Sequence, residues 1–212
     1  MAYATNCFIN CPFDPAYEKK LLKPIVFTAI SVGLNPRICE NPNNGQSRVE
    51  YLTSLIKDSK YGIHDICRME ISSSGYPRFN MPFELGIDWG LRISSIPKYV
   101  SKTIFIMDAK PHRYTAALSD LAGFDPIIHK EKPEILIGKL RNAFYTSLND
   151  KTMISGNKIW LNYQKCMSDI MVNGDIDYQG FNEMPVKEYV HWVKQWFKGK
   201  GSLVAISMRK EL

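Results

Sequence analysis

Several catalytic signatures are missing from this sequence, and each absence removes a class of enzyme. No G-x-G-x-x-G follows the first predicted strand and no G-x-x-x-x-G-K-[ST] occurs anywhere, which argues against ordinary dinucleotide-dependent redox chemistry and P-loop phosphoryl transfer. The G-x-S-x-G serine elbow is absent, and the four histidines show no H-E-x-x-H spacing for zinc. What remains is chemistry performed by a carboxylate, with no metal and no cofactor.

The chain also lacks the features of an exported or membrane protein. Its five cysteines are an odd number without the close pairing that a structural zinc site needs, so we expect reduced thiols. Residues 1–6 contain no basic and then apolar signal segment, and no apolar run reaches the roughly 18 residues of a membrane span. We therefore expect a cytoplasmic protein with no membrane partner.

Long runs of one charge are absent as well. The formal net charge of +6 suits an anionic partner. The lysines are spread among acidic and apolar residues instead of forming a basic arm, which argues against binding to nucleic acid. The charge by itself does not choose among a nucleotide, a nucleic acid and a membrane surface.

Strand-like and helical patterns alternate over most of the chain. Strand-like runs lie at 7–9, 36–39, 61–67, 103–108 and 126–129, and helical patterns lie at 16–32, 47–56, 82–93, 116–122 and 133–145. This alternation predicts an α/β fold of the flavodoxin-like, doubly wound type, with a parallel sheet and helices on both faces. Only helical patterns follow, at 159–172 and 185–197. We therefore expect an α/β domain over 1–149 and a helical C-terminal extension over 150–212.

The last of these helices carries an apolar stripe that has to be buried. Its members recur at helical spacing and are Val186, Tyr189, Val190, Val193, Trp196 and Phe197. Packing against the sheet domain is one explanation, and an interface with a second subunit or a partner is the other.

The segment from Asn80 to Gly86 places a single carboxylate, that of Glu84, on the first turn of a predicted apolar helix. Pro82 suits the first helical position, and Asn80 or Met81 lies where the cap belongs. A glutamate in this place either complements the helix dipole, an effect of roughly 0.3–1 kcal/mol, or takes part in chemistry.

Further polar side chains follow the predicted strands, where open parallel sheets bind their ligands. They are Asn10, Phe13 and Asp14 after the first strand, Arg48 after the second and Asp65 at the third. Their carboxylates, with that of Glu84, can hold a ribose diol, and Arg48 can hold phosphates. Each of them can equally be a solvated loop residue, and Asp65 can pair with His64 or Arg68 for structural reasons.

Four short segments resemble the TIR-like and nucleoside 2-deoxyribosyltransferase-like proteins over about residues 5 to 145. They are Phe8-Ile9-Asn10, Pro12-Phe13-Asp14, Ile56-x-x-Ser59 and Phe83-Glu84-Leu85-Gly86. In both families the glutamate acts at the anomeric carbon of a ribose and cleaves an N-glycosidic bond, so the resemblance gives this role to Glu84. An aromatic side chain, such as Phe8 or Phe13, can stack on a base.

The resemblance implies an enzyme that takes NAD as its substrate and cleaves the bond to nicotinamide. Bacterial TIR-like proteins often act in antiphage defence and can turn NAD into a signalling nucleotide, which implies a downstream effector protein and a homo-oligomer that completes the site. The alternatives are a deoxyribosyltransferase or nucleotide N-glycosidase and, outside enzymes, a non-catalytic nucleotide sensor or assembly module. The expected site has Glu84 as catalytic residue and Phe8, Asn10, Phe13, Asp14, Arg48, Asp65 and Asn80 as substrate-binding residues.

Overall fold

The computed structural model describes residues 2–39, 47–69 and 75–199. Its contacts divide the chain into two units that are interleaved along the sequence. Unit 1 comprises Met1–Asp14 and Asn35–Glu131, and unit 2 comprises Pro15–Leu34 and Lys132–Leu212. The predicted domain boundary at residue 149 stays a prediction.

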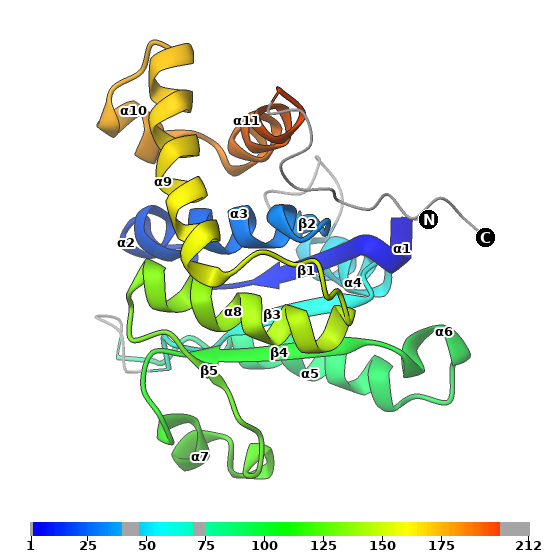
Figure 1. The fold of residues 1–212 in the computed structure, drawn as a ribbon. Coiled ribbons are helices and arrows are strands. Elements are labelled where there is room, and N and C mark those ends of the chain that lie inside the picture. Colours follow the sequence, from blue (N-terminus) through cyan, green and yellow to red (C-terminus); the bar gives the residue numbers. More distant parts are fainter. Residues whose placement is uncertain (1, 40–46, 70–74, 200–212) are drawn as a thin grey trace, which may run out of the picture. The chain divides into compact units, whose positions relative to one another are not determined.

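Unit 1 is built on a five-stranded sheet in which every pair of neighbours is parallel. The strands are β1 (Asn6–Asn10), β2 (Asn35–Ile38), β3 (Tyr61–Asp65), β4 (Thr103–Asp108) and β5 (Ile127–Ile128), and they lie in the order β2-β1-β3-β4-β5 (Figure 1). Both β1 and β3 are buried along their whole length, as parallel strands usually are. The prediction of an α/β fold with a parallel sheet is confirmed.

The third strand ends at Asp65, two residues before its predicted end at Cys67. The Asp65 carboxylate accepts a hydrogen bond from the Cys67 backbone N–H at 2.9 Å. This local bond turns the chain away from the sheet, because an aspartate side chain can replace the backbone acceptor that a neighbouring strand would supply.

Two of the helices of unit 1 pack together on the sheet. The helices are α1 (Ala2–Thr5), α4 (Arg48–Lys57), α5 (Asn80–Ile93), α6 (Pro97–Val100) and α7 (Arg113–Ala117), with a 3₁₀ turn at Ser119–Leu121. Buried residues of α4 form one apolar cluster with Phe8 of β1 and Cys39, and Ile87 and Leu91 of α5 pack against that cluster. The helices α4 and α5 therefore cover the same face of β1.

Helix α5 begins two residues earlier than predicted, at Asn80. Phe83 N–H makes a helical hydrogen bond to Phe79 O at 3.0 Å. Pro82 is the third residue of α5, where its missing N–H costs no helical bond. Glu84 therefore lies in the second turn, and the prediction that it occupies the first turn is wrong.

In the described residues of unit 2 all regular secondary structure is helical, and turns and irregular segments connect the helices. Its helices are α2 (Pro15–Tyr17), a π-helical segment (Glu18–Leu22), α3 (Lys23–Ser31), α8 (Pro133–Leu148), α9 (Gly156–Asn173), α10 (Tyr178–Glu183) and α11 (Val186–Gly199). The single helix predicted over 16–32 is thus interrupted by a wider π turn that ends at Leu22, two residues before Pro24. Proline cannot donate to the helical ladder, which favours an irregular turn at this place.

The apolar stripe of α11 packs within unit 2. Tyr189 and Val193 are buried, and the Tyr189 hydroxyl donates to Lys23 O of α3 at 3.3 Å. The Phe27 ring of α3 lies 5.9 Å from that of Trp196 and 5.3 Å from that of Phe197. The stripe is therefore buried at Tyr189 and Val193 and half-buried at its other members, and a role in oligomer assembly stays a prediction.

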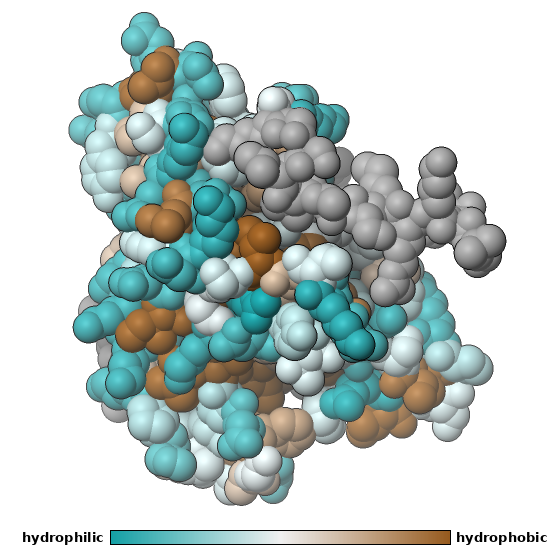
Figure 2. All heavy atoms as spheres, in the orientation of Figure 1, coloured by the Kyte–Doolittle hydropathy of each residue, from teal (hydrophilic) through white to brown (hydrophobic). Residues whose placement is uncertain are grey.

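Exposed hydrophobic side chains are scattered over the surface. On the face drawn in Figure 2 they form small brown groups separated by hydrophilic residues in teal. Scattered exposure of this kind is ordinary for a folded protein. None of the described helices has both the length and the apolar composition needed to cross a membrane.

Candidate functional site

Glu84 lies half-buried on α5, and its neighbours come from the end of β2 and the start of α4. Burial raises the pKa of Glu84 to about 7, and the positive charge of Arg48 acts in the opposite direction. Burial also raises the pKa of the Cys39 thiol, which in turn feels the charges of both Arg48 and Glu84. A carboxyl group that titrates near neutral pH can bind or release a proton at physiological pH.

A buried chain of polar side chains runs between the sheet and α5. The amide nitrogen of Asn10 donates to His64 Nδ1 at 3.0 Å and to Met81 O at 2.9 Å. His64 Nε2 lies 2.9 Å from Asp88 Oδ2, and Lys102 Nζ lies 3.0 Å from Asp88 Oδ1. Because an amide nitrogen can only donate, His64 Nδ1 accepts, and the ring carries its proton on Nε2 and donates it to Asp88.

The ammonium group of Lys102 has an ion pair and two hydrogen bonds. Besides its ion pair with Asp88, it donates to Ser59 O and to Ile56 O, the latter at 2.9 Å. Lys102 therefore has one ion-pair partner and two hydrogen-bond acceptors although its side chain is buried. A buried charge needs pairing of this kind to persist in a folded protein.

This series of buried polar side chains fixes α5 to the sheet at two points. Asn10 holds the carbonyl of Met81, and His64 and Lys102 hold Asp88 two turns later. The buried residues of α5 are Met81, Leu85 and Asp88, which share one face of the helix. Glu84 lies between Met81 and Asp88 in the helix. The buried polar side chains therefore set the position and rotation of the turn that carries Glu84.

Gly62 leaves the space in which Asp88 meets His64. A Cβ at residue 62 would overlap Asp88 Oδ2 and lie 2.9 Å from His64 Nε2. We expect Gly62→Ala to lower the free energy of unfolding by about 1–3 kcal/mol, measured by urea denaturation. Gly86→Ala is the matched control, because nothing lies within 4 Å of its Cβ and alanine favours a helix by about 0.5–1 kcal/mol. Equal effects of the two substitutions would contradict this role of Gly62.

A second buried cluster lies beyond β3 and β5. One ligand atom each from Asp65, Cys67 and His129 lies within 4.8 Å of the others, and His129 Nε2 is 3.1 Å from Asp65 Oδ2. Glu131 N–H donates to His129 Nδ1 at 3.0 Å, so the ring keeps its proton on Nε2, the atom a metal would need. Metal-bound histidines normally donate from their second nitrogen, the reverse of this arrangement. Burial and the charge of Asp65 also raise the pKa of Cys67, which opposes the thiolate form. The cluster therefore fits an Asp–His pair better than a metal centre.

Of the two side chains that could pair with Asp65, His64 does not do so. Asp65 lies against His129, whereas His64 turns to Asp88. His64 and Asp65 are adjacent in a strand, and adjacent strand residues point to opposite faces of a sheet.

Two arginines form ion pairs with the carboxylate of Asp14, beyond the carboxyl ends of the strands. Arg68 Nε lies 3.4 Å and Arg78 Nη1 lies 3.6 Å from Asp14 Oδ2. Arg68 Nη1 also donates to Glu131 Oε1 at 2.8 Å. Opposite charges are therefore already paired in this part of the edge.

The structure separates the predicted site residues into several places. Glu84 and Arg48 are neighbours, Asn10 belongs to the buried chain, Asp65 to the pair with His129, Asp14 to the arginines and Phe8 to the apolar core. Phe13, at 39% exposure, and Asn80 lie on the surface. The sequence did not point to Asp88, Lys102 or His129. Assignment of the predicted residues to one substrate site stays a prediction.

The candidate site thus consists of a half-buried glutamate beside an arginine, on a helix anchored by a buried polar chain. A functional inference starts from these features of the residues. No protein-family model matches the chain, and comparisons with curated proteins and with solved structures give no match.

Proposed function

We propose that this protein cleaves the N-glycosidic bond between nicotinamide and ribose in NAD, with Glu84 as the catalytic carboxylate. The observation that carries the proposal is the half-buried Glu84, whose pKa burial raises to about 7 beside Arg48. Perturbed carboxyl groups of this kind are common at catalytic sites.

The chemistry suits such a group. When the bond between C1′ and the pyridinium nitrogen breaks, its electron pair stays on nitrogen, so nicotinamide leaves as a neutral molecule without an added proton. C1′ becomes oxocarbenium-like, and the ionised carboxylate of Glu84 stabilises that positive charge. Water then forms the new C1′–O bond and gives its proton to Glu84, which returns it to solvent. Arg48 would hold the phosphates.

The strand order supports the same place for a ligand. The order β2-β1-β3-β4-β5 is that of the flavodoxin-like, doubly wound folds, whose ligands bind beyond the carboxyl ends of the strands where the order reverses. In this sheet the reversal lies between β1 and β3. Asn10 at the end of β1 holds the N-terminal turn of α5, next to the turn that carries Glu84.

Product analysis tests the proposal. The purified protein is incubated separately with NAD, with 2′-deoxynucleosides and with nucleoside monophosphates, and the products are resolved by chromatography and mass spectrometry, with Glu84→Gln as the control for contaminating activity. Release of nicotinamide with ADP-ribose or its cyclised form supports the proposal, and a cyclised product would suit a defence signal read by an effector protein. Base exchange would instead favour the deoxyribosyltransferase, and binding without any product would favour a sensor or assembly module.

The charge of Arg48 gives a prediction for pH dependence. Arg48 lowers the pKa of Glu84, so Arg48→Ala should move that pKa above about 7. Because the ionised carboxylate is the active form, the acid limb of a plot of kcat/KM against pH should shift to higher pH. Arg48→Lys keeps the charge and should leave the midpoint nearer to wild type. Identical midpoints in the alanine variant and wild type would remove Arg48 from the surroundings of Glu84.

A further inference from the structure

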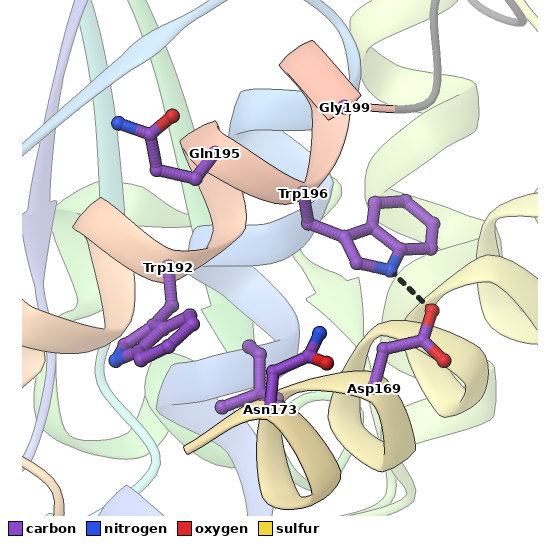
Figure 3. Close-up of a pocket in the computed structure, with 7 residues that line it drawn as sticks. Asp169, Asn173, Trp192, Gln195, Trp196 and Gly199 are labelled. Atoms are coloured by element: carbon purple, nitrogen blue, oxygen red, sulfur yellow. Dashed lines mark hydrogen bonds between the residues drawn. The ribbon is translucent and has the colours of Figure 1, made fainter.

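A pocket of about 270 Å³ opens between α9 and α11 of unit 2. Its lining residues are Asp169, Ile170, Asn173, Trp192, Gln195, Trp196 and Gly199 (Figure 3). Drug-sized ligands usually occupy about 300–1,000 Å³, so the pocket suits a smaller molecule than a dinucleotide.

Two tryptophans supply the aromatic part of the lining. Trp192 and Trp196 project from successive turns of α11 toward α9 (Figure 3). Trp192 is half-buried, and within the described ranges no other aromatic ring or cation lies against its indole. The face of an indole ring attracts cations more strongly than that of any other side chain.

A carboxylate faces the same space. Asp169 of α9 accepts a hydrogen bond from Trp196 Nε1 at 2.8 Å (Figure 3), which holds one of its oxygens in a fixed orientation. No cationic side chain of the described part of the chain pairs with Asp169. The pocket therefore combines a negative charge with indole rings, and none of the described residues places a cation against Asp169 or Trp192.

We propose that this pocket binds a small, free organic cation with an alkylated ammonium group. Indole faces favour the methyl groups of such an ion through cation–π attraction, and Asp169 supplies the opposite charge. Asn173 and Gln195, which also line the pocket, can bond to a polar tail of the ligand. This proposal stands independently of the chemistry proposed for Glu84, because it uses other residues of another unit.

Titration of the full-length protein provides the first test. Choline and tetramethylammonium are added at constant ionic strength while the indole N–H signals are followed by NMR, and 3,3-dimethylbutan-1-ol serves as the neutral isostere of choline. We expect saturable shifts of tryptophan signals with the cations and at least about tenfold weaker binding of the neutral isostere. No saturable binding of either cation, or equal affinity for the neutral isostere, would overturn the proposal.

Substitutions locate the binding. Asp169→Asn keeps an oxygen that can accept from Trp196 but removes the charge, and Trp192→Leu removes an indole; each should weaken cation binding by about tenfold. Glu134→Gln removes the same charge from an exposed residue of α8 in the same unit and should leave the affinity unchanged. Unchanged affinity in both pocket variants would place the cation elsewhere and reject the proposal. If one variant fails to fold, the other variant and the comparison with the neutral isostere decide.

The source of the cation is settled by a vesicle assay. Vesicles of phosphatidylcholine carry the same headgroup charge on a surface. We expect no co-sedimentation of the protein with them. Co-sedimentation without binding of free choline would reject a free ligand.

Discussion

The Glu84→Gln variant is expected to lose about 10²–10⁴-fold in the rate of NAD cleavage while it stays folded. Glutamine keeps the shape of the side chain but can neither stabilise a positive C1′ nor accept a proton from water. Single-turnover release of nicotinamide measures the loss, and circular dichroism checks the fold. Wild-type turnover in this variant would remove Glu84 from the mechanism.

The same substitution should change stability in a pH-dependent way. In the folded protein the pKa of Glu84 is about 7, above its ordinary value of 4.5, so between these values the folded state binds more protons than the unfolded state. The contribution of this group to stability therefore falls as the pH rises through that window. Glutamine has no such penalty, so the variant should gain stability over wild type between pH 4.5 and pH 7 and keep the gain above it. Urea denaturation at both ends of the window measures the difference, with exposed Glu50→Gln as the control.

Lys102→Met is expected to lower the free energy of unfolding by about 3–5 kcal/mol, the largest stability effect that we predict. Methionine has a similar length, but it leaves the buried carboxylate of Asp88 without its cation and removes the donor to the carbonyls of Ile56 and Ser59. Lys98→Met is the matched control. Lys98 is 44% exposed and lies 3.9 Å from Asp58, so its loss should cost less than about 1 kcal/mol.

A double variant separates the buried charge from the packing of the lysine stem. Asp88→Leu combined with Lys102→Met removes both charges, so the pair should be less destabilised than the sum of the two single variants. Urea unfolding of the wild type, the two single variants and the double variant gives the interaction energy between the two residues. Additive effects would show that the two charges do not interact and would contradict the ion pair.

The fold was accessible from the sequence because its signals are local. The segment Thr103 to Asp108 contains a continuous apolar run from Ile104 to Met107, and the structure has a strand over the segment. The sequence pointed to Glu84 as a candidate for a similar reason, since a short motif surrounds it. The start of α5 was missed by two residues because proline is tolerated anywhere in the first turn of a helix, so Pro82 did not mark a unique position.

The buried polar side chains that contact one another around Asp88 could not be found in the same way, because they come from separate elements. Asp88 follows Met81 and Leu85 at helical spacing, which places the three on one face, but only tertiary contacts show that this face is buried. Lys102 stands between α6 and β4, where an exposed lysine is the ordinary expectation. Likewise, the bond from Lys23 to Asn182 O joins residues 159 positions apart, and no local pattern predicts it.

The interleaving of the two units has a consequence for biosynthesis. Helix α3, buried along all nine of its residues, is translated early, whereas α8, α9 and α11 leave the ribosome only after the whole of Asn35–Glu131. At about 5–20 residues per second the ribosome needs several seconds or more for that stretch. During this delay the apolar side chains of α3 lack their partners from unit 2, so the nascent chain presents a binding site for chaperones that the finished protein no longer has.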